Sequence, residues 1–312
     1  MINKNSRIFI AGHNGMLGNS IYNFLKEKGY KKLIVIEKKK LDLTNQYLVK
    51  KFFKKKKPEA VIIAAAKVGG IKANINYPVE FIKNNIEIQT NLISASYAQK
   101  VKKLIFFGSS CIYPAGLNKP IKEDHILTGR LEKTNESYAI AKISGLQLLK
   151  AYNQQFKTNY LCLMPCNLFG PKDNYDLKNS HFIPALIRKI YSASKKIKNK
   201  EVKLWGTGTP LREVLYVREV AEACEFFLRK KTKHTLINIG SKTEMSIKKF
   251  AEIIKNNIDP SVKVKFDRNK RLNGVKRKKL DISLAKKYGW SSKMSFKFAL
   301  NKTLEDFYKT YK

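Results

Sequence analysis

Two short groups of residues have the types and the spacing needed to protonate a carbonyl oxygen. Ser109 stands 29 positions before Tyr138, and Lys142 follows Tyr138 by four. Residues four apart share one face of a helix, so the Lys142 ammonium can approach the Tyr138 phenol. A nearby positive charge lowers the pKa of a phenol from its usual value of about 10, so we expect Tyr138 to act as an acid. Cys111, two residues after Ser109, is a second candidate for proton transfer.

A glycine-rich segment, Gly12-x-x-Gly15-x-x-Gly18, indicates where a dinucleotide would bind. It follows an expected strand at 7–11 and opens an expected helix at 15–28, which is the context that such a fingerprint requires. Glycines let the backbone turn sharply and approach a pyrophosphate, whose charge the helix N-terminus stabilises. Alone, the pattern could be an ordinary strand-to-helix turn, but its context favours a nicotinamide cofactor.

The residues after the second expected strand bear on the choice between NADP(H) and NAD(H). An acidic residue at this place binds the adenosine ribose and disfavours a 2′-phosphate, whereas basic residues accept the phosphate. Glu37 is followed at once by Lys38 and two more lysines, and Asn14 in the glycine loop carries no charge. We expect NADP(H), held by Lys38 or its neighbours, while NAD(H) stays an alternative. Asp42 could hydrogen-bond the adenine, although a surface or helix-capping role is equally ordinary for such a residue.

Apolar runs alternate with amphipathic stretches in the first half of the chain, a pattern typical of parallel strands covered by helices. The predicted strands are 7–11, 32–36, 60–65, 104–107, 160–164 and 236–239, the last returning to the main sheet. The predicted helices between them are 15–28, 45–56, 85–100 and 138–156. Later in the chain we predict helices 182–194 and 247–257, strands 203–205 and 262–266, and a helical end.

These elements predict an α/β protein with a Rossmann-type doubly wound parallel sheet and a smaller C-terminal α/β domain. We assign residues 1–170 to an NADP-binding Rossmann domain, to which the segment at about 213–243 returns. Residues 171–212 and 244–312 are assigned to a substrate-binding domain.

The net charge of +39, from 63 basic and 24 acidic residues, would suit a surface that binds nucleic acid. Lysines, however, are spread through nearly every segment instead of forming one tail or arm. This distribution favours solvated faces that attract anionic substrates, so we expect no dedicated nucleic-acid partner.

No apolar run approaches the roughly 18 residues of a membrane span, and the first one is too short for a signal peptide. We therefore expect a cytoplasmic protein without a membrane partner. The four cysteines show neither Cys-x-x-Cys spacing nor an accompanying histidine cluster. Reduced thiols, and no metal site, are the expectation.

Several motifs together resemble the extended short-chain dehydrogenase/reductases, and within that family the GDP-L-fucose synthases. The resemblance covers essentially the whole chain, and the glycine loop and the Tyr-x-x-x-Lys pair are its widely shared parts. Its narrower parts are Lys67-Val68-Gly69-Gly70, Ser109-Ser110-Cys111 and His181. Its later parts include Trp205-Gly206-Thr207-Gly208-Thr209-Pro210-Leu211-Arg212-Glu213 and Arg277-Lys278-Lys279-Leu280-Asp281.

The resemblance implies that GDP-4-keto-6-deoxy-D-mannose is epimerised at C3 and C5 and then reduced at C4 with NADPH, which yields GDP-L-fucose. Protons on carbons beside a ketone are acidic because the enolate delocalises charge, so inversion needs a base and an acid. The resemblance assigns these tasks to Cys111 and His181. For the reduction it assigns protonation of the C4 oxygen to Tyr138. Lys142 would lower the pKa of Tyr138 and hold the nicotinamide ribose, and Ser109 would hydrogen-bond the ketone oxygen.

The resemblance also implies the binding residues. The expected cofactor residues are Gly12, His13, Asn14, Gly15, Met16, Leu17, Gly18, Lys38, Asp42, Phe107, Gly108, Ser109, Ser110, Lys142, Pro165, Cys166, Asn167, Leu168 and His181. The expected substrate residues are Asn167, Lys189, Trp205, Arg212 and Asn273. Family members commonly carry arginine where Lys189 stands, so the bidentate grip of a guanidinium on phosphate is lost here. The family is usually dimeric, and a homodimer through helices 85–100 and 138–156 is expected.

Two alternatives stay open. Another sugar-nucleotide enzyme of the same family, a 4-epimerase or 4,6-dehydratase that uses NAD, would share the fold. A dehydratase is expected to carry an Asp-Glu pair where this chain has Ser110-Cys111, and a 4-epimerase needs no pairing of Cys111 with His181. The second alternative is a catalytically idle Rossmann protein whose basic surface binds nucleic acid. Singly, Cys111 is typical of a small buried apolar residue, but the joint occurrence of these motifs favours catalysis.

Overall fold

The structure is a computed structural model and describes residues 2–177, 180–267 and 275–311. Its main layer is a parallel sheet of six strands in the order β2-β1-β3-β4-β5-β9. The strands are β1 (Ile8–Ala11), β2 (Leu33–Ile34), β3 (Ala60–Ile63), β4 (Lys103–Phe107), β5 (Tyr160–Pro165) and β9 (Leu236–Ile239). Every residue of β1, β3, β4, β5 and β9 is buried, as expected of a parallel sheet that is covered on both faces.

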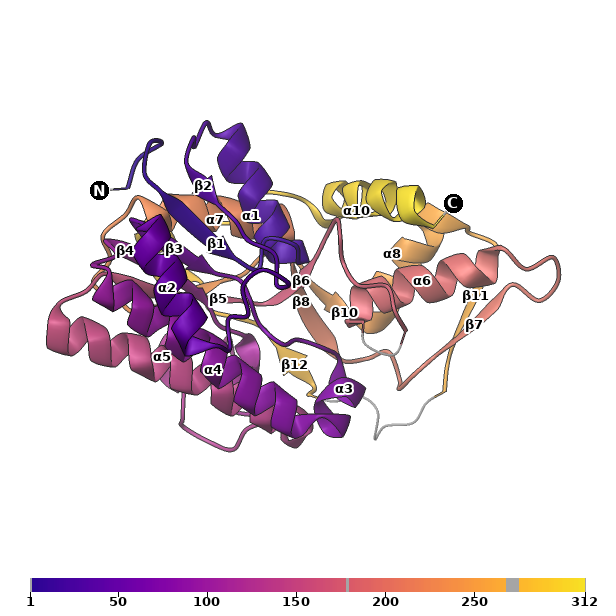
Figure 1. The fold of residues 1–312 in the computed structure, drawn as a ribbon. Helices are drawn as coiled ribbons and strands as arrows, with labels where there is room; N and C mark the ends of the chain where they lie inside the picture. The colour runs from indigo at the N-terminus through magenta and orange to yellow at the C-terminus, as the bar shows by residue number, and fades with distance from the viewer. Residues whose placement is uncertain (1, 178–179, 268–274, 312) are drawn as a thin grey trace.

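Helices cover both faces of this sheet (Figure 1). The helices of the main layer are α1 (Met16–Glu27), α2 (Gln46–Lys56), α4 (Pro78–Ala98), α5 (Glu136–Phe156) and α7 (Val217–Leu228). α1 packs against α7 on one face, while α4 packs against both α2 and α5 on the other. The prediction of a doubly wound α/β sheet is confirmed, including the return of 236–239, which pairs with β5.

Beyond β5 the chain builds a second part with its own strands and helices, to the right in Figure 1. Its strands are β6 (Asn167–Phe169), β7 (Glu201–Leu204), β8 (Leu211–Tyr216), β10 (Glu244–Ser246), β11 (Lys263–Phe266) and β12 (Arg277–Lys278). β8 pairs with β6, β10 and β12, and β7 pairs with β11. Its main helices are α6 (Phe182–Ser194), α8 (Ile247–Ile258) and α10 (Phe296–Thr310). Ser246 accepts a hydrogen bond from the Lys249 amide at 3.1 Å, so it caps α8 as predicted.

The molecule has two apolar cores, one for each part. The larger core surrounds the six-stranded sheet, and the smaller one lies among α6, α8, α10, β7 and β8. The remaining helices are short, namely α3 (Ile71–Asn76), α9 (Ser283–Lys287) and the 3₁₀ turns Ser110–Ile112, Glu123–His125 and Lys133–Asn135.

Two expectations about elements were wrong. α4 begins at Pro78 instead of residue 85, because proline suits the first turn of a helix, where its missing N–H is not needed. The segment 213–243 contains β8 and α7 as well as the predicted strand, although no helix was predicted there.

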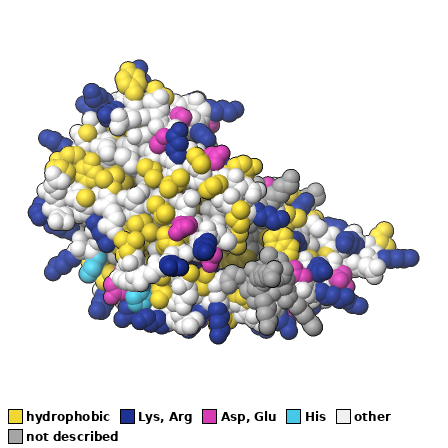
Figure 2. Space-filling model, turned by 90° about the horizontal axis from the view of Figure 1, so that it is seen from below, with side chains coloured by type: hydrophobic (Ala, Val, Ile, Leu, Met, Phe, Trp, Pro, Cys, Tyr) yellow, Lys and Arg dark blue, Asp and Glu magenta, His cyan; other side chains and the backbone are white. Residues whose placement is uncertain are grey.

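In the part of the chain that the structure describes, no helix is long and apolar enough to cross a membrane. All four cysteines are buried and unbridged. Within the same residues, no group of three or more histidine, cysteine or acidic side chains could hold a metal ion. Figure 2 shows basic side chains scattered around the outline of one face instead of gathered in a single patch.

Candidate active site

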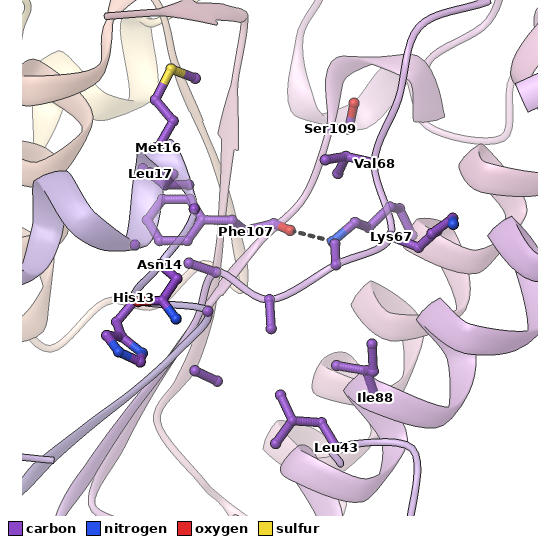
Figure 3. A pocket seen from close by; sticks show the side chains of 18 of the residues that line it. His13, Asn14, Met16, Leu17, Leu43, Lys67, Val68, Ile88, Phe107 and Ser109 are labelled. Carbon is purple, nitrogen blue, oxygen red and sulfur yellow. Dashed lines mark hydrogen bonds between the residues drawn. The ribbon is translucent and has the colours of Figure 1, made fainter. Parts of the chain in front are cut away.

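A cavity of about 630 Å³ opens where β1, β3, β4 and β5 end. This is the edge of a parallel sheet at which α/β proteins commonly bind ligands. The cavity is lined by every one of the expected cofactor residues, from the glycine loop to His181. Figure 3 shows His13 and Asn14 of the loop across the cavity from Leu43 and Ile88.

The glycine loop fits the close approach of a dinucleotide. Gly12 has a φ of +90°, and a Cβ there would lie 2.6 Å from the Ala65 backbone nitrogen. A side chain on Gly18 would overlap the Gly12 carbonyl oxygen, so this glycine lets α1 pack against the turn that follows β1. The N-terminus of α1, where Gly15 and Met16 line the cavity, is therefore open to a phosphate. These residues fit a nicotinamide dinucleotide.

Ser109 and Tyr138 come together at one end of the cavity. The Ser109 hydroxyl hydrogen-bonds the Tyr138 phenol, which favours ionisation, but burial outweighs it and raises the pKa of Tyr138. The Phe81 ring of α4, with its centroid 6.0 Å from that of Tyr138, packs edge-on against the phenol. The expectation that this pKa is lowered was therefore wrong for this structure, because apolar surroundings disfavour a phenolate.

Lys142 is the buried cation beside this tyrosine. Its Nζ lies 5.8 Å from the Tyr138 ring centroid and donates a hydrogen bond of 2.9 Å to the Phe107 carbonyl oxygen, drawn in Figure 3. It also lies 4.6 Å from the centre of the Phe106 ring. Burial lowers the pKa of Lys142 to about 8, so its charge is easily lost.

Cys111 lies just behind the cavity wall, in the turn Ser110–Ile112, and is 5% exposed. Its backbone N–H points at the Ser109 hydroxyl oxygen, 3.5 Å away. Burial raises the pKa of the Cys111 thiol, while the nearby charges of Lys278 and Lys142 partly oppose this rise. Cys111 is thus a neutral thiol next to Ser109, but it is not among the residues that line the cavity.

His181 is the residue just before α6 and lines the cavity with an exposed side chain. Although solvent reaches the ring, the protein around it disfavours the imidazolium and lowers the pKa of His181 from its usual value. At neutral pH His181 is therefore an uncharged imidazole, which has one nitrogen free to accept a proton.

At the other end of the cavity, Lys38 and Asp42 lie among the apolar side chains of Ile36, Leu41 and Leu43. One Asp42 oxygen accepts bonds from the Thr44 backbone N–H, at 3.0 Å, and from the Thr44 hydroxyl, at 2.8 Å. These bonds lower the pKa of Asp42 and keep it ionised. Lys38 lines the cavity and can reach a phosphate bound there, whereas its neighbour Glu37 does not line the cavity.

The expected substrate residues fall into two places. Arg212 donates bonds to the Leu211 and Val275 carbonyl oxygens, at 2.8 and 2.7 Å, and burial lowers its pKa. Lys189 and Trp205 form a separate contact, with Nζ 4.7 Å from the centre of the indole ring. Asn167 lines the cavity and donates to the Glu213 carbonyl oxygen at 3.0 Å. Asn273 lies outside the described residues.

Sequence reasoning assigned no site role to two groups near the site, although parts of both were noted among the motifs of the resemblance. The segment 64–69, which follows β3, lines the cavity together with Asn84 and Ile88. Its position after a buried parallel strand was the available signal, because such strands end at one common edge. Lys278 of β12 interacts electrostatically with Cys111 and Arg212, and burial lowers its pKa. No local pattern predicts this contact, since β12 is far from both in sequence.

Comparisons with known proteins show the family to which the chain belongs. The sequence profile of the NAD dependent epimerase/dehydratase family matches residues 8–240. GDP-L-fucose synthase 1 of Arabidopsis thaliana is 44% identical over 306 residues, 98% of this chain and 94% of that protein. GDP-L-fucose synthase of Sinorhizobium fredii is 45% identical over 302 residues, 96% of this chain and 95% of that protein.

Among solved structures, a GDP-L-fucose synthetase from Naegleria fowleri bound to NADP superposes with a TM-score of 0.91 at 27% identity. The match covers 100% of this chain and 95% of that one. The family relationship that the motifs indicated is confirmed over almost the full length. The chain belongs to the NAD dependent epimerase/dehydratase family.

Proposed function

We propose that this protein converts GDP-4-keto-6-deoxy-D-mannose to GDP-L-fucose by 3,5-epimerisation and NADPH-dependent reduction. One observation carries the proposal: Ser109, Tyr138, Lys142 and His181 line the same cavity as the glycine loop, with Cys111 packed directly beside Ser109. One cavity thus holds the residues suited to carbonyl reduction and one proton carrier, His181, while the second proton carrier, Cys111, lies just behind its wall. Relatives at 44% and 45% identity that carry the name GDP-L-fucose synthase support it.

The protonation states support the first step. The Cys111 thiol holds its proton because burial raises its pKa, and the His181 imidazole is neutral because its surroundings lower its pKa. One group can therefore give a proton and the other can take one, as inversion beside a ketone requires.

The same region supports the second step. NADPH, when bound, supplies the hydride that reduces the C4 ketone. Tyr138 keeps its proton until the C4 oxygen gains negative charge, and Ser109 hydrogen-bonds the phenol. Lys142 is placed to hold the nicotinamide ribose. In this structure its Nζ donates a hydrogen bond to the Phe107 carbonyl oxygen. Lys38 on the cavity wall favours NADP over NAD, and the NADP-bound relative supports that choice.

The proposal also assigns the cofactor and the substrate to different parts of the chain. Residues 1–170 with 213–243 would bind the cofactor, while 171–212 and 244–312 would bind the GDP-sugar. Arg212 and Lys189 suit the diphosphate, and Trp205 suits a base or sugar face. We also propose that the protein is cytoplasmic and that it forms a homodimer, because the outer face of α4 and α5 is partly apolar.

The decisive experiment incubates the purified protein with GDP-4-keto-6-deoxy-D-mannose and either NADPH or NADH, and identifies the sugar by NMR. We expect GDP-L-fucose and faster turnover with NADPH. The Tyr138→Phe variant, which keeps the ring but loses the phenolic proton, is the control and should form no reduced sugar. Tightly bound NAD with no net NADPH oxidation would instead favour a 4-epimerase, and absence of any fucose product from folded protein would refute the proposal.

A further inference from the structure

Two lysines from different parts of the molecule converge on one exposed indole ring. Lys72 Nζ lies 4.8 Å from the centre of the Trp205 ring, and Lys189 Nζ lies 4.7 Å from it. The Trp205 side chain itself is 53% exposed. We propose that Lys72 and Lys189 form a clamp at Trp205 that binds the diphosphate of the sugar nucleotide. The inference rests on the proposed function and adds Lys72 to its binding site.

The three residues come from three different elements. Lys72 is on α3, which directly follows the cavity-lining segment 64–69. Lys189 is on α6, which begins just after His181, and Trp205 directly follows β7. In Figure 1, α3 lies where the layer of the main sheet meets the second part of the molecule. An anion held by both lysines would therefore bridge the cofactor part and the substrate part.

The indole is held by a fixed loop. The Gly206 N–H donates a 2.7 Å hydrogen bond to Asp267, and Gly208, at a φ of +74°, packs against the Phe266 ring. A Cβ on Gly208 would lie 2.7 Å from that ring, so the loop can follow this path only with glycine. Trp205 is thus a preorganised platform onto which both ammonium groups are drawn.

The charges around the platform call for an anion. Burial lowers the pKa of Lys189, the charge of Lys72 lowers it further, and the charge of Asp267 opposes both. Among the described residues of this cluster, two ammonium groups and one carboxylate leave a net positive charge next to an aromatic face. A bridging phosphate would relieve the repulsion between the two lysines and restore the full charge of Lys189.

A second lysine strengthens the grip on a phosphate. Lys189 alone offers phosphate only a single ammonium group, without the fork of a guanidinium. Lys72 supplies a second ammonium group at the same indole ring, so the two lysines together can offer a phosphate two points of contact, as one forked guanidinium does. The diphosphate, with several anionic oxygens, is the part of a sugar nucleotide that can contact both.

The test measures GDP, GMP and guanosine binding by calorimetry, in the wild type and in Lys72→Met, Lys72→Arg and Lys51→Met. Lys51 is an exposed lysine on α2 and controls for the loss of one positive charge. We expect Lys72→Met to weaken GDP binding roughly three- to tenfold and guanosine binding not at all. Lys72→Arg should restore the affinity for GDP. The Kd for NADPH should stay as in the wild type.

The titration needs no turnover, so it separates the two proposals. If no GDP-L-fucose forms and Lys72→Met still weakens GDP binding relative to Lys51→Met, the clamp stands and the reaction is wrong. If GDP-L-fucose forms but Lys72→Met and Lys51→Met bind GDP equally, the clamp is refuted. A wild type that binds GDP no more tightly than guanosine also overturns the clamp, because a diphosphate site must favour the diphosphate.

Discussion

At the scale of single residues, the surroundings of each side chain determine which groups of the site hold a proton. Burial raises the pKa of Tyr138 and of Cys111 and lowers that of Lys142, while the protein around the exposed ring of His181 lowers the pKa of that imidazole. Each of these side chains is therefore neutral over a wider pH range than the same side chain would be in water. Neutral side chains can exchange protons with a ketone and its enolate without a charged group first being buried in apolar surroundings. A combined epimerase and reductase needs such proton exchange.

The two proton carriers can be tested apart from the hydride step. We expect Cys111→Ser and His181→Gln to slow exchange of the C3 and C5 protons into D₂O on the order of a hundredfold, because each removes a general acid or base. Reduction of an already epimerised 4-keto substrate should change little. NMR of the exchanged positions and NADPH absorbance measure the two steps. A variant that loses reduction more than exchange would contradict the assignment.

The pH dependence of reduction should report Lys142. Its pKa is lowered to about 8, so it is charged below that pH and neutral above it. The pKa of Tyr138 is raised, so the phenol keeps its proton throughout this range. We expect kcat/KM for NADPH, which reports groups of the free enzyme, to fall as the pH rises through about 8. Lys142→Met should be about a hundredfold slower, and its profile should be flat there.

The outcome that would contradict this prediction is a decline through pH 8 that persists unchanged in Lys142→Met. Such a result would place the titrating group elsewhere, for example at Lys278, whose pKa is also lowered by burial.

The chemistry-bearing residues could be predicted from sequence because their motifs are local. The glycine loop and the Tyr138-Lys142 pair each lie in one strand–turn–helix or one helix, and the structure brings both to one cavity. The pKa of Tyr138 could not be predicted, because Phe81, which packs on its ring, belongs to another helix. The electrostatic interaction of Lys278 with Cys111 was missed for the same reason, since the pairing of β12 with β8 places Lys278 far from its neighbours in sequence.

At the scale of elements, the turn between β1 and α1 depends on Gly12. We expect Gly12→Ala to destabilise the fold by about 2–6 kcal/mol, since a side chain at φ +90° is strained and its Cβ would overlap the Ala65 backbone. NADPH binding should weaken with it. Urea unfolding and NADPH fluorescence measure the two effects.

Gly116 offers a matched control, because its φ is +84° but nothing lies within 4 Å of a Cβ built there. Gly116→Ala should destabilise the fold by only the strain of a positive φ, about 1–3 kcal/mol, and should leave NADPH binding intact. Equal losses of stability in the two variants would show that the close approach of Ala65 adds nothing to the cost of Gly12→Ala.

The strands of the main sheet were predictable because each is a short, fully apolar run between polar turns. The start of α4 was not, because only Phe81 is buried among the missed residues 78–84, so this stretch shows little of the apolar period from which helices are predicted. Further along α4, Asn85 donates to the Lys67 carbonyl oxygen, and Asn91 donates to the Leu43 and Thr44 carbonyl oxygens. The helix thus ties down two cavity-lining segments.

At the scale of the whole molecule, charge and apolar surface have different distributions. The +39 charge comes from lysines dispersed over the surface, which raises the local concentration of anionic ligands without defining one binding face. Hydrophobic side chains instead gather on the face of α4 and α5, which Figure 2 views. Tyr97 is 38% and Phe156 is 41% exposed there, with ring centroids 4.3 Å apart.

This face gives the last prediction, that two chains pair through α4 and α5. A two-fold axis would bring the Tyr97 and Phe156 rings of both chains into one self-complementary patch, and burying exposed rings favours association. Tyr97→Arg would place a charge in that patch, so we expect it to weaken dimerisation by at least thirtyfold in analytical ultracentrifugation. Tyr47→Arg, on a tyrosine of α2 that is 69% exposed, is the matched control and should leave the dimer intact. If Tyr97→Arg sediments as the wild type does, the chains pair through another surface.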